Sequence, residues 1–185
     1  DGIGLVRDIQ DNLDVLLEDK RILVLGAGGA AMGAMLPLIE CRPARIVVAN
    51  RTASRASDMV EEFVEAADQY NVELWAGGLD ALDALAEDER CDVVINASSS
   101  SLQGEVPPVP EHLLGEGVLV YDMMYGAQPT VFLAYAAKCG ARTADGLGML
   151  VEQAAEAFYN WRGVRPSTAP VLAELRAALQ AEAAR

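Results

Sequence analysis

A turn made only of glycine and alanine follows a short aliphatic segment near the start of the chain. The aliphatic segment is Ile22–Leu25, and a helix-forming segment continues beyond the turn to Glu40. The turn consists of Gly26, Ala27, Gly28, Gly29, Ala30 and Ala31. Gly26 permits a tight turn, Gly28 lets the backbone approach a pyrophosphate, and the small side chain of Ala31 lets the helix pack on its strand. The start of the helix offers free N–H groups and a positive dipole end. We therefore predict a dinucleotide-binding turn and disfavour a turn of this composition that binds nothing.

The residues after the second apolar segment, 45–49, indicate which dinucleotide the turn binds. They are Asn50, Arg51 and Thr52, with Arg55 one helical turn further on. NAD-binding proteins usually place Asp or Glu here to bind the ribose 2′-hydroxyl. Guanidinium groups instead pair with phosphate through a planar fork. Each cation at a helix N-terminus costs about 0.3–1 kcal/mol, so a bound anion explains two of them better than chance exposure. The sequence thus predicts NADP(H).

Other residue types with chemical potential give a weaker signal. Ser98–Ser101 follow an expected strand at the sheet edge where such folds bind ligands, which favours a functional loop over a merely flexible one. The cysteines, Cys41, Cys91 and Cys139, are widely spaced, and His112 is the single histidine. This pattern indicates buried free thiols and no metal site.

Apolar segments of strand length alternate with segments of helical periodicity throughout the chain. The expected strands are 21–25, 45–49, 72–75, 92–96, 118–121 and 141–143. The expected helices are 2–17, 30–40, 52–69, 79–86, 130–139, 147–161 and 170–184. The alternation predicts one α/β domain over residues 1–185, a doubly wound Rossmann-type domain with a six-stranded parallel sheet and helices on both faces. Right-handed crossovers predict the strand order 3-2-1-4-5-6.

Composition limits the classes of partner. The 185 residues include 28 acidic and 14 basic ones, for a net charge of −14. Nucleic acid requires a basic face, so it is not an expected partner. No apolar run approaches the roughly 20 residues of a membrane span, and the first residues do not read as a signal peptide. We expect a cytoplasmic protein without a membrane partner. The sequence leaves the oligomeric state open, and a homodimer is one state that it allows.

Taken together, these motifs resemble the nicotinamide-binding domain of the shikimate dehydrogenase family. The similar blocks are 1–4, 26–30, 50–52, 96–99, 121–125 and 145–155. The first and last blocks are the most specific. The resemblance implies reversible, NADP-dependent reduction of 3-dehydroshikimate to shikimate, in aromatic amino acid (chorismate) biosynthesis. It also implies an N-terminal substrate domain that this chain lacks, joined through flanking helices 3–17 and 170–184. We therefore expect the chain alone to bind the cofactor and to be inactive.

The resemblance also implies a role for individual positions. Asp1 matches an aspartate that shares proton transfer with a catalytic lysine of the substrate domain, and with Tyr125 and Gln153 it matches residues near the substrate. The implied cofactor contacts around the nicotinamide are Asn96, Ala97, Ser98, Ser99, Met123, Gly146 and Met149. From the residue types alone, Asp1 would be a disordered end, Gln153 a structural amide, Tyr125 an exposed turn residue and the methionines core residues.

Two alternative functions remain open at this point. One is a quinate/shikimate dehydrogenase relative that prefers NAD, which Asn50, Thr52 and Arg55 disfavour. The other is a non-catalytic module that binds or senses NADP, which the missing substrate domain would suit.

Overall fold

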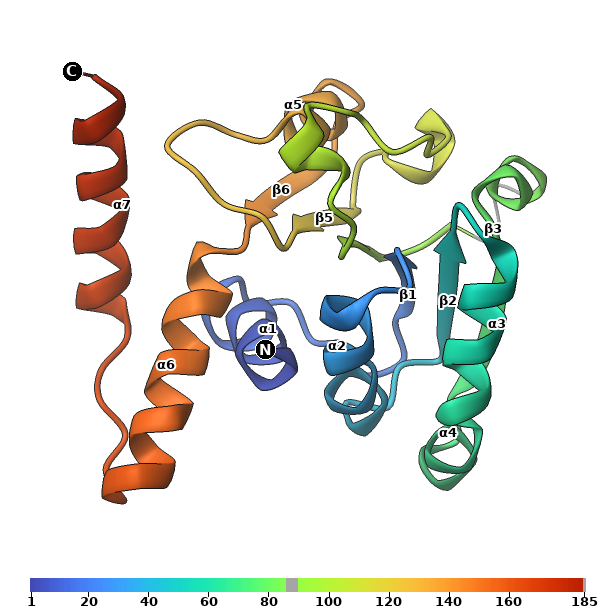
Figure 1. The fold of residues 1–185 in the computed structure, drawn as a ribbon, viewed down its shortest axis with the longest axis horizontal. Helices are drawn as coiled ribbons and strands as arrows, with labels where there is room; N and C mark the ends of the chain where they lie inside the picture. The colour runs from blue at the N-terminus through green and yellow to red at the C-terminus, as the bar shows by residue number, and fades with distance from the viewer. Residues whose placement is uncertain (86–89, 185) are drawn as a thin grey trace.

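A six-stranded sheet forms the centre of the computed structural model, which describes residues 1–85 and 90–184 (Figure 1). The strands are β1 (Arg21–Leu25), β2 (Arg45–Asn50), β3 (Glu73–Gly78), β4 (Val93–Asn96), β5 (Leu119–Asp122) and β6 (Arg142–Asp145). Their order is β3-β2-β1-β4-β5-β6, and every neighbouring pair is parallel. Both the predicted fold class and the predicted strand order are confirmed.

Helices cover both faces of the sheet. They are α1 (Gly2–Arg7), α2 (Gly29–Glu40), α3 (Ala53–Glu62), α4 (Val64–Tyr70), α5 (Val131–Lys138), α6 (Leu147–Arg162) and α7 (Ala169–Ala183). Shorter elements are a π-helix at Asp8–Asn12 and 3₁₀ helices at Leu79–Ala84, Ser100–Gln103 and Glu111–Leu113. None of the described helices is long and apolar enough to cross a membrane.

The core has two halves because successive side chains of a strand point to opposite faces of the sheet. Ile22 and Val24 of β1 join the cluster that includes residues of α1 and α2. Leu23 and Leu25 of the same strand join the cluster under α5. These four β1 residues are aliphatic and buried, as expected for a central strand of a parallel sheet.

Three predicted helices differ from the observed ones. The helix expected over 2–17 ends earlier: α1 passes into the π-helix, and Asp14 then adopts a left-handed conformation with φ 54°. The burial of the apolar residues beyond it does not follow a helical period, since Leu17 is buried whereas Leu16 is 71% exposed. The helix expected over 52–69 is broken at Phe63 into α3 and α4. The segment expected over 79–86 is a 3₁₀ helix to Ala84, and residue 86 lies outside the described residues.

Glycines allow α1 to lie directly against its neighbours. A Cβ atom on Gly2 would lie 2.3 Å from the Gly33 carbonyl oxygen in α2. One on Gly4 would lie 2.5 Å from the Met149 carbonyl oxygen and 2.9 Å from Gln153 in α6. Only glycine permits such close backbone contact, so α1 is held between α2 and α6 (Figure 1).

A buried carboxylate fastens this helical layer to the sheet. Asp8 is 3% exposed, and its Oδ2 accepts a hydrogen bond from the Tyr121 hydroxyl of β5 at 2.6 Å. Its Oδ1 accepts one from the Asn12 amide at 2.9 Å. A Cβ atom on Gly148 would lie 1.9 Å from the carboxylate, so α6 approaches Asp8 through a glycine. Burial, more than any other cause, raises the pKa of Asp8.

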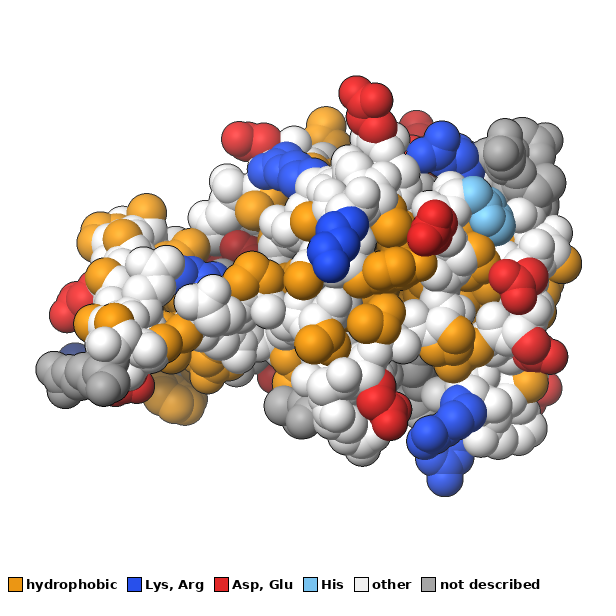
Figure 2. All heavy atoms as spheres, turned by 90° about the horizontal axis from the view of Figure 1, so that it is seen from above, with side chains coloured by type: hydrophobic (Ala, Val, Ile, Leu, Met, Phe, Trp, Pro, Cys, Tyr) orange, Lys and Arg blue, Asp and Glu red, His pale blue; other side chains and the backbone are white. Residues whose placement is uncertain are grey.

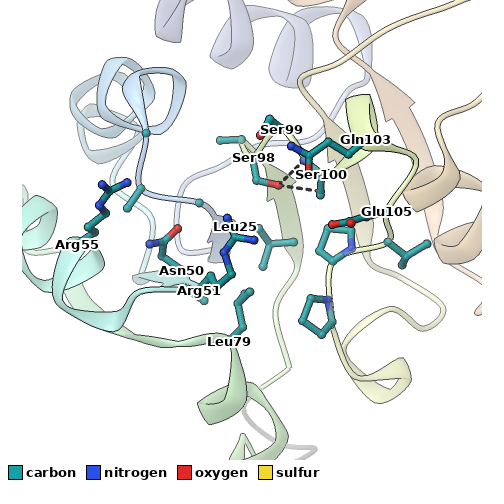
Figure 3. Close-up of a pocket in the computed structure, with 18 of the residues that line it drawn as sticks. Leu25, Asn50, Arg51, Arg55, Leu79, Ser98, Ser99, Ser100, Gln103 and Glu105 are labelled. Atoms are coloured by element: carbon teal, nitrogen blue, oxygen red, sulfur yellow. Dashed lines mark hydrogen bonds between the residues drawn. The ribbon is translucent and has the colours of Figure 1, made fainter.

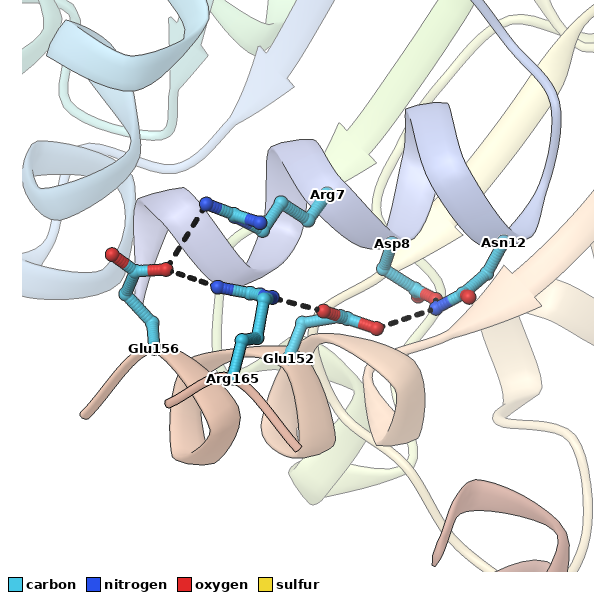
Figure 4. Close-up of polar contacts among 6 residues, drawn as sticks. All are labelled: Arg7, Asp8, Asn12, Glu152, Glu156 and Arg165. Carbon is cyan, nitrogen blue, oxygen red and sulfur yellow. Dashed lines mark hydrogen bonds and ion pairs between the residues drawn. The ribbon is translucent and has the colours of Figure 1, made fainter. Parts of the chain in front are cut away.

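The same polar cluster extends along α6 (Figure 4). Asn12 also donates to Glu152 at 3.3 Å, and Arg165 donates to Glu152 at 3.0 Å. Arg165 further pairs with Glu156, which Arg7 of α1 contacts at 3.1 Å. These alternating charges connect α1, the π-helix and α6 into one unit.

The Tyr121–Asp8 hydrogen bond predicts a pH-dependent stability effect. Tyr121→Phe leaves the buried, charged Asp8 oxygen without its donor, which should lower the free energy of unfolding at neutral pH by about 1–3 kcal/mol. Because the folded-state pKa of Asp8 is raised, the native state holds this proton to higher pH than the unfolded chain, and stability falls as pH rises between the two pKa values. In acid, where Asp8 is protonated, the loss caused by Tyr121→Phe should therefore be smaller.

Urea unfolding of both proteins at neutral and acidic pH measures the difference. Tyr159→Phe is the matched control, since Tyr159 is 47% exposed on α6. An equal loss for the two variants, or a loss that grows in acid, would contradict the assigned bond.

Candidate cofactor site

A cavity of about 720 Å³ lies at the carboxyl ends of β1, β2 and β4 (Figure 3). Its position is the one that parallel α/β sheets offer to ligands, where neighbouring crossovers run to opposite faces. The predicted cofactor residues in its lining are Gly26, Ala27, Gly28, Asn50, Arg51, Arg55, Ala97, Ser98 and Ser99. Sequence positions from three separate strand ends are thus brought to one cavity.

The glycine turn has the conformation that its sequence predicts. Gly26 has φ +106°, its N–H donates to the Ala49 carbonyl at 2.8 Å, and a Cβ atom there would lie 3.2 Å from the Ser98 nitrogen. Gly28 is the N-cap of α2 and no side chain caps this helix. A Cβ atom on Gly28 or Gly29 would have no described neighbour within 4 Å, so open space faces the helix N-terminus. This open end suits an anion, because the first N–H groups of a helix lack intrahelical partners.

The last two alanines of the turn, Ala30 and Ala31, lie behind this space. Ala31 is fully buried in the core and Ala30 is half-buried against it, and neither lines the cavity. Ala31 therefore has the packing role that its small size predicts.

Two arginines border the cavity where β2 ends. Arg51 and Arg55 are exposed, and neither side chain has a hydrogen bond or ion pair within residues 1–85 and 90–184. The Asn50 amide donates to the Thr52 carbonyl at 2.9 Å, which shapes the turn into α3. Thr52 is the N-cap residue of α3, but its side chain makes no capping hydrogen bond and does not line the cavity. In a chain with a net charge of −14, these two cations mark a local site for a negative group.

The side-chain amide of a buried residue, Asn96, fixes the serine loop, residues 98–101. Asn96 is fully buried and does not line the cavity. Its Oδ1 accepts hydrogen bonds from the Ser98 backbone at 3.1 Å and the Ser98 hydroxyl at 2.7 Å. Its Nδ2 donates to Ser101 and to Asp122, each at 3.2 Å. Asn96 therefore positions Ser98, which does face the cavity.

Asp122 is a further polar residue at this end of the sheet, and the sequence patterns did not single it out. It ends β5, is fully buried, and accepts hydrogen bonds from the Ser101 hydroxyl at 2.5 Å and the Thr130 hydroxyl at 2.7 Å. It also accepts one from the Met124 backbone at 3.1 Å. One carboxylate thus joins the loop after β4, the loop after β5 and the start of α5. The available signal was a charged residue ending an otherwise apolar strand.

The remaining predicted cofactor residues lie beyond the cavity, at the ends of β5 and β6. Met123 is 5% exposed and belongs to the core. A Cβ atom on Gly146 would lie 2.1 Å from the Met123 carbonyl oxygen, so this position requires glycine. Met149 is half-buried on the first turn of α6. The structure brings Met123 and Gly146 into contact.

The predicted substrate residues occupy the outer part of this end. Tyr125 is 45% exposed after β5. Gln153 packs against Gly4, and Asp1 is exposed one helical turn earlier on α1, where its carbonyl accepts the Leu5 N–H. Within the described residues, Oε1 of Gln153 is the buried side-chain oxygen or nitrogen that lacks a hydrogen-bond partner. A buried acceptor left unpaired is costly, so Gln153 stands out among the buried polar groups of the described residues.

Part of the cavity wall was not predicted from the sequence. It is formed by Leu79, Asp80, Gln103, Glu105, Val106, Pro107 and Pro108, whereas Ser100 belongs to the serine loop that was expected to be functional. These residues belong to two irregular connections, after β3 and after β4, whose course depends on tertiary packing. The proline-rich sequence of the second connection was the only local signal.

Comparison with known proteins agrees with this geometry. The family "Shikimate / quinate 5-dehydrogenase" matches residues 7–103, and "Shikimate 5'-dehydrogenase C-terminal domain" matches residues 146–176. The shikimate dehydrogenase (NADP(+)) of Cupriavidus necator is 87% identical over 182 residues, which cover 98% of this chain and 62% of that protein.

Two solved structures have the same fold. An Ael1 enzyme from Pseudomonas putida has a TM-score of 0.83 and 45% identity, with 94% of this chain and 61% of that one covered. A shikimate dehydrogenase in complex with NADP+ has a TM-score of 0.78 and 30% identity, with 96% and 61% covered. This chain therefore spans somewhat less than two thirds of the length of these proteins. The extent of the family matches and the high identity show that the chain belongs to the shikimate / quinate 5-dehydrogenase family.

Proposed function

We propose that this chain is the NADP(H)-binding half of an enzyme that reversibly reduces 3-dehydroshikimate to shikimate in aromatic amino acid biosynthesis. The observation that carries the proposal is the cavity that joins the open end of α2 to the unpaired Arg51 and Arg55. The name of the Cupriavidus necator relative, shikimate dehydrogenase (NADP(+)), supports the same reaction.

The cavity residues fit the parts of NADP(H). The open space before Gly28 and Gly29 suits the pyrophosphate, since the helix N–H groups face it. Arg51 and Arg55 suit the 2′-phosphate, because they are cationic, exposed and unpaired within the described part of the chain. When bound, NADPH supplies the hydride, while the protein binds and orients the cofactor.

The strand order supports one direction for the bound dinucleotide. From Arg51 at β2, the strand ends continue through β1 and β4 to β5 and β6. A dinucleotide with its 2′-phosphate at Arg51 and its pyrophosphate at Gly28 therefore extends toward Ser98 and then toward Met123 and Gly146. This direction supports the predicted nicotinamide contacts.

The substrate would bind beyond that end, next to Gln153. The unpaired Oε1 of Gln153 supports its predicted role as the acceptor for a substrate hydroxyl. The proposed role of Asp1 is proton transfer together with a lysine of the preceding part of the enzyme. Tyr125, exposed on the loop after β5, is proposed to contact the substrate from the other side.

The exposed apolar surface of the C-terminal helices supports a contact with the substrate domain. No residue of α7 is buried, and α7 projects from the body of the molecule with hydrophobic side chains along it (Figure 2). At the end of α6, Trp161 is 80% exposed, and Val164 beyond it is 63% exposed. We propose that this surface adjoins the substrate domain. A homodimer and a cytoplasmic location stay predictions.

The cofactor assignment predicts which variants change binding. Arg51→Gln and Arg55→Gln should each weaken NADPH binding about tenfold or more, because each removes a charge-assisted hydrogen bond worth about 1.5–3 kcal/mol. NADH has no 2′-phosphate, so its weaker binding should not change. Fluorescence titration of the chain with both cofactors measures the effect. Arg162→Gln, an exposed change on α6, is the control, and equal wild-type affinity for NADH and NADPH would refute the assignment.

The proposed division of the active site between this chain and the substrate domain predicts which protein is active. The chain alone should bind NADPH without reducing 3-dehydroshikimate, whereas the longer enzyme should do so, and Asp1→Asn in the longer enzyme should lower kcat by about 10²- to 10⁴-fold. NADPH affinity should be unchanged, since Asp1 lies outside the cavity. Steady-state kinetics with shikimate and quinate test both points. Turnover by the chain alone would contradict this division, faster turnover of quinate would favour the quinate relative, and an inactive longer protein that binds NADPH would favour a sensing module.

A further inference from the structure

The C-terminal helix α7 is attached to the domain mainly through one side chain. No residue of α7 is buried, and the helix lies at the edge of the molecule, beyond α6 (Figure 1). Among the described residues, the side-chain hydrogen bonds and ion pairs that α7 makes come from Arg176. Apolar packing of α7 is slight, so the contacts of Arg176 determine how it is seated.

Arg176 forms a two-pronged contact with Asp145. Its NH1 group donates to Oδ2 at 2.8 Å, and its NH2 group donates to Oδ1. The Asp145 side chain is 10% exposed and that of Arg176 is 35% exposed. A forked, partly buried contact of this kind fixes orientation as well as distance, which a lysine would not do.

Asp145 stands directly before the proposed nicotinamide contacts. It ends β6, pairs in register with Asp122 of β5, and its Oδ1 accepts the Leu147 N–H at 3.3 Å. The carboxylate therefore shapes the turn that contains Gly146 and begins α6. Arg176 holds this carboxylate from the outside.

The same guanidinium also reaches the loop after β5. NH1 of Arg176 donates to the Gly126 carbonyl at 3.0 Å. Upstream in this loop, the Met124 carbonyl accepts the Gly146 N–H at 3.1 Å, and Met123 is in backbone contact with Gly146. One side chain of α7 thus bridges the two segments that follow β5 and β6.

We infer that Arg176 is a positioning residue for the nicotinamide end of the site. It touches neither the cavity nor the proposed cofactor contacts, and it acts by holding Asp145 and the Gly126 carbonyl in one geometry. The inference rests on the proposed NADP(H) binding and deepens it, because it makes the nicotinamide half of the site depend on the C-terminal helix. The adenosine half, at Arg51 and Arg55, is independent of Arg176.

Two ligands separate these halves experimentally. NADPH occupies the whole site, whereas adenosine 2′,5′-bisphosphate carries only the adenosine half with its 2′-phosphate. Arg176→Gln should weaken NADPH binding to the 185-residue chain about tenfold, since displacement of a positioning contact by about an ångström has effects of this order or larger. Binding of the bisphosphate, measured by calorimetry, should stay at the wild-type value.

A second variant, Arg176→Lys, keeps the test decisive if Arg176→Gln fails to fold. It keeps the charge and most of the packing but cannot hold Asp145 and Gly126 together, so it should show the same selective loss of NADPH affinity. The control is Arg142→Gln, at an exposed residue at the opposite end of β6, which should leave the affinity for both ligands unchanged. Thermal unfolding of each variant confirms that it is folded.

Two results would overturn the inference. One is unchanged NADPH affinity in both Arg176 variants, and the other is an equal loss for NADPH and the bisphosphate, which would make Arg176 merely structural. Failure of the wild-type chain to bind either ligand is a separate result, because it would refute the proposed function itself.

Discussion

The parallel hydrogen bonding of β1 between β2 and β4 is the constraint on which the rest of the structure depends. Because the three strands point the same way and are in register, Leu25 lies beside Ala49 on one side and Asn96 on the other. The chain must then leave all three strands at one edge of the sheet. That edge collects the glycine turn, the arginines after β2 and the serines after β4 without any direct attraction among them.

Close packing between neighbouring segments is the second constraint, and glycine residues permit it. Gly4, Gly146 and Gly148 each face a neighbouring segment at a distance that a Cβ atom would not tolerate. The first and last hold the helical layer together, and Gly146 joins the segments after β5 and β6. These contacts bring α1 and α6 near enough for their polar side chains to interact.

Three carboxylates, the buried Asp8 and Asp122 and the partly buried Asp145, then fix connections between elements that apolar packing does not fix. Asp8 joins the helical layer to β5, Asp122 joins the loops after β4 and β5, and Asp145 seats α7 through Arg176. Asp8 and Asp122 accept their hydrogen bonds from neutral donors, whereas Asp145 is paired with a cation. A buried carboxylate with several donors is expensive to leave unsatisfied, so each one favours a single arrangement of its partners.

Local patterns in the sequence determined the strands, the glycine turn and the pair of arginines at the cavity, because each depends on a short run of residues. The strand order followed from the alternation of strands and helices together with the right-handed crossover rule. The same reasoning failed where tertiary contacts override periodicity. The segment 2–17 has helical spacing, yet residues 13–17 are not helical, and Leu17 is buried in this irregular segment. Asn96 was correctly expected at the end of a strand, but only the structure shows that its side chain accepts hydrogen bonds from the Ser98 backbone and hydroxyl.

Only the tertiary structure decided which distant polar groups meet. Tyr121 and Asp8 are 113 positions apart, and nothing near either residue in the sequence indicates the other. Likewise, Arg176 reads as an ordinary helix-surface arginine until α7 is seated beside β6. Propensity and periodicity act over a few residues, whereas these pairs result from the packing of the whole domain. The sequence alone therefore determined the kind of cofactor site, and the fold decided which residues hold that site in place.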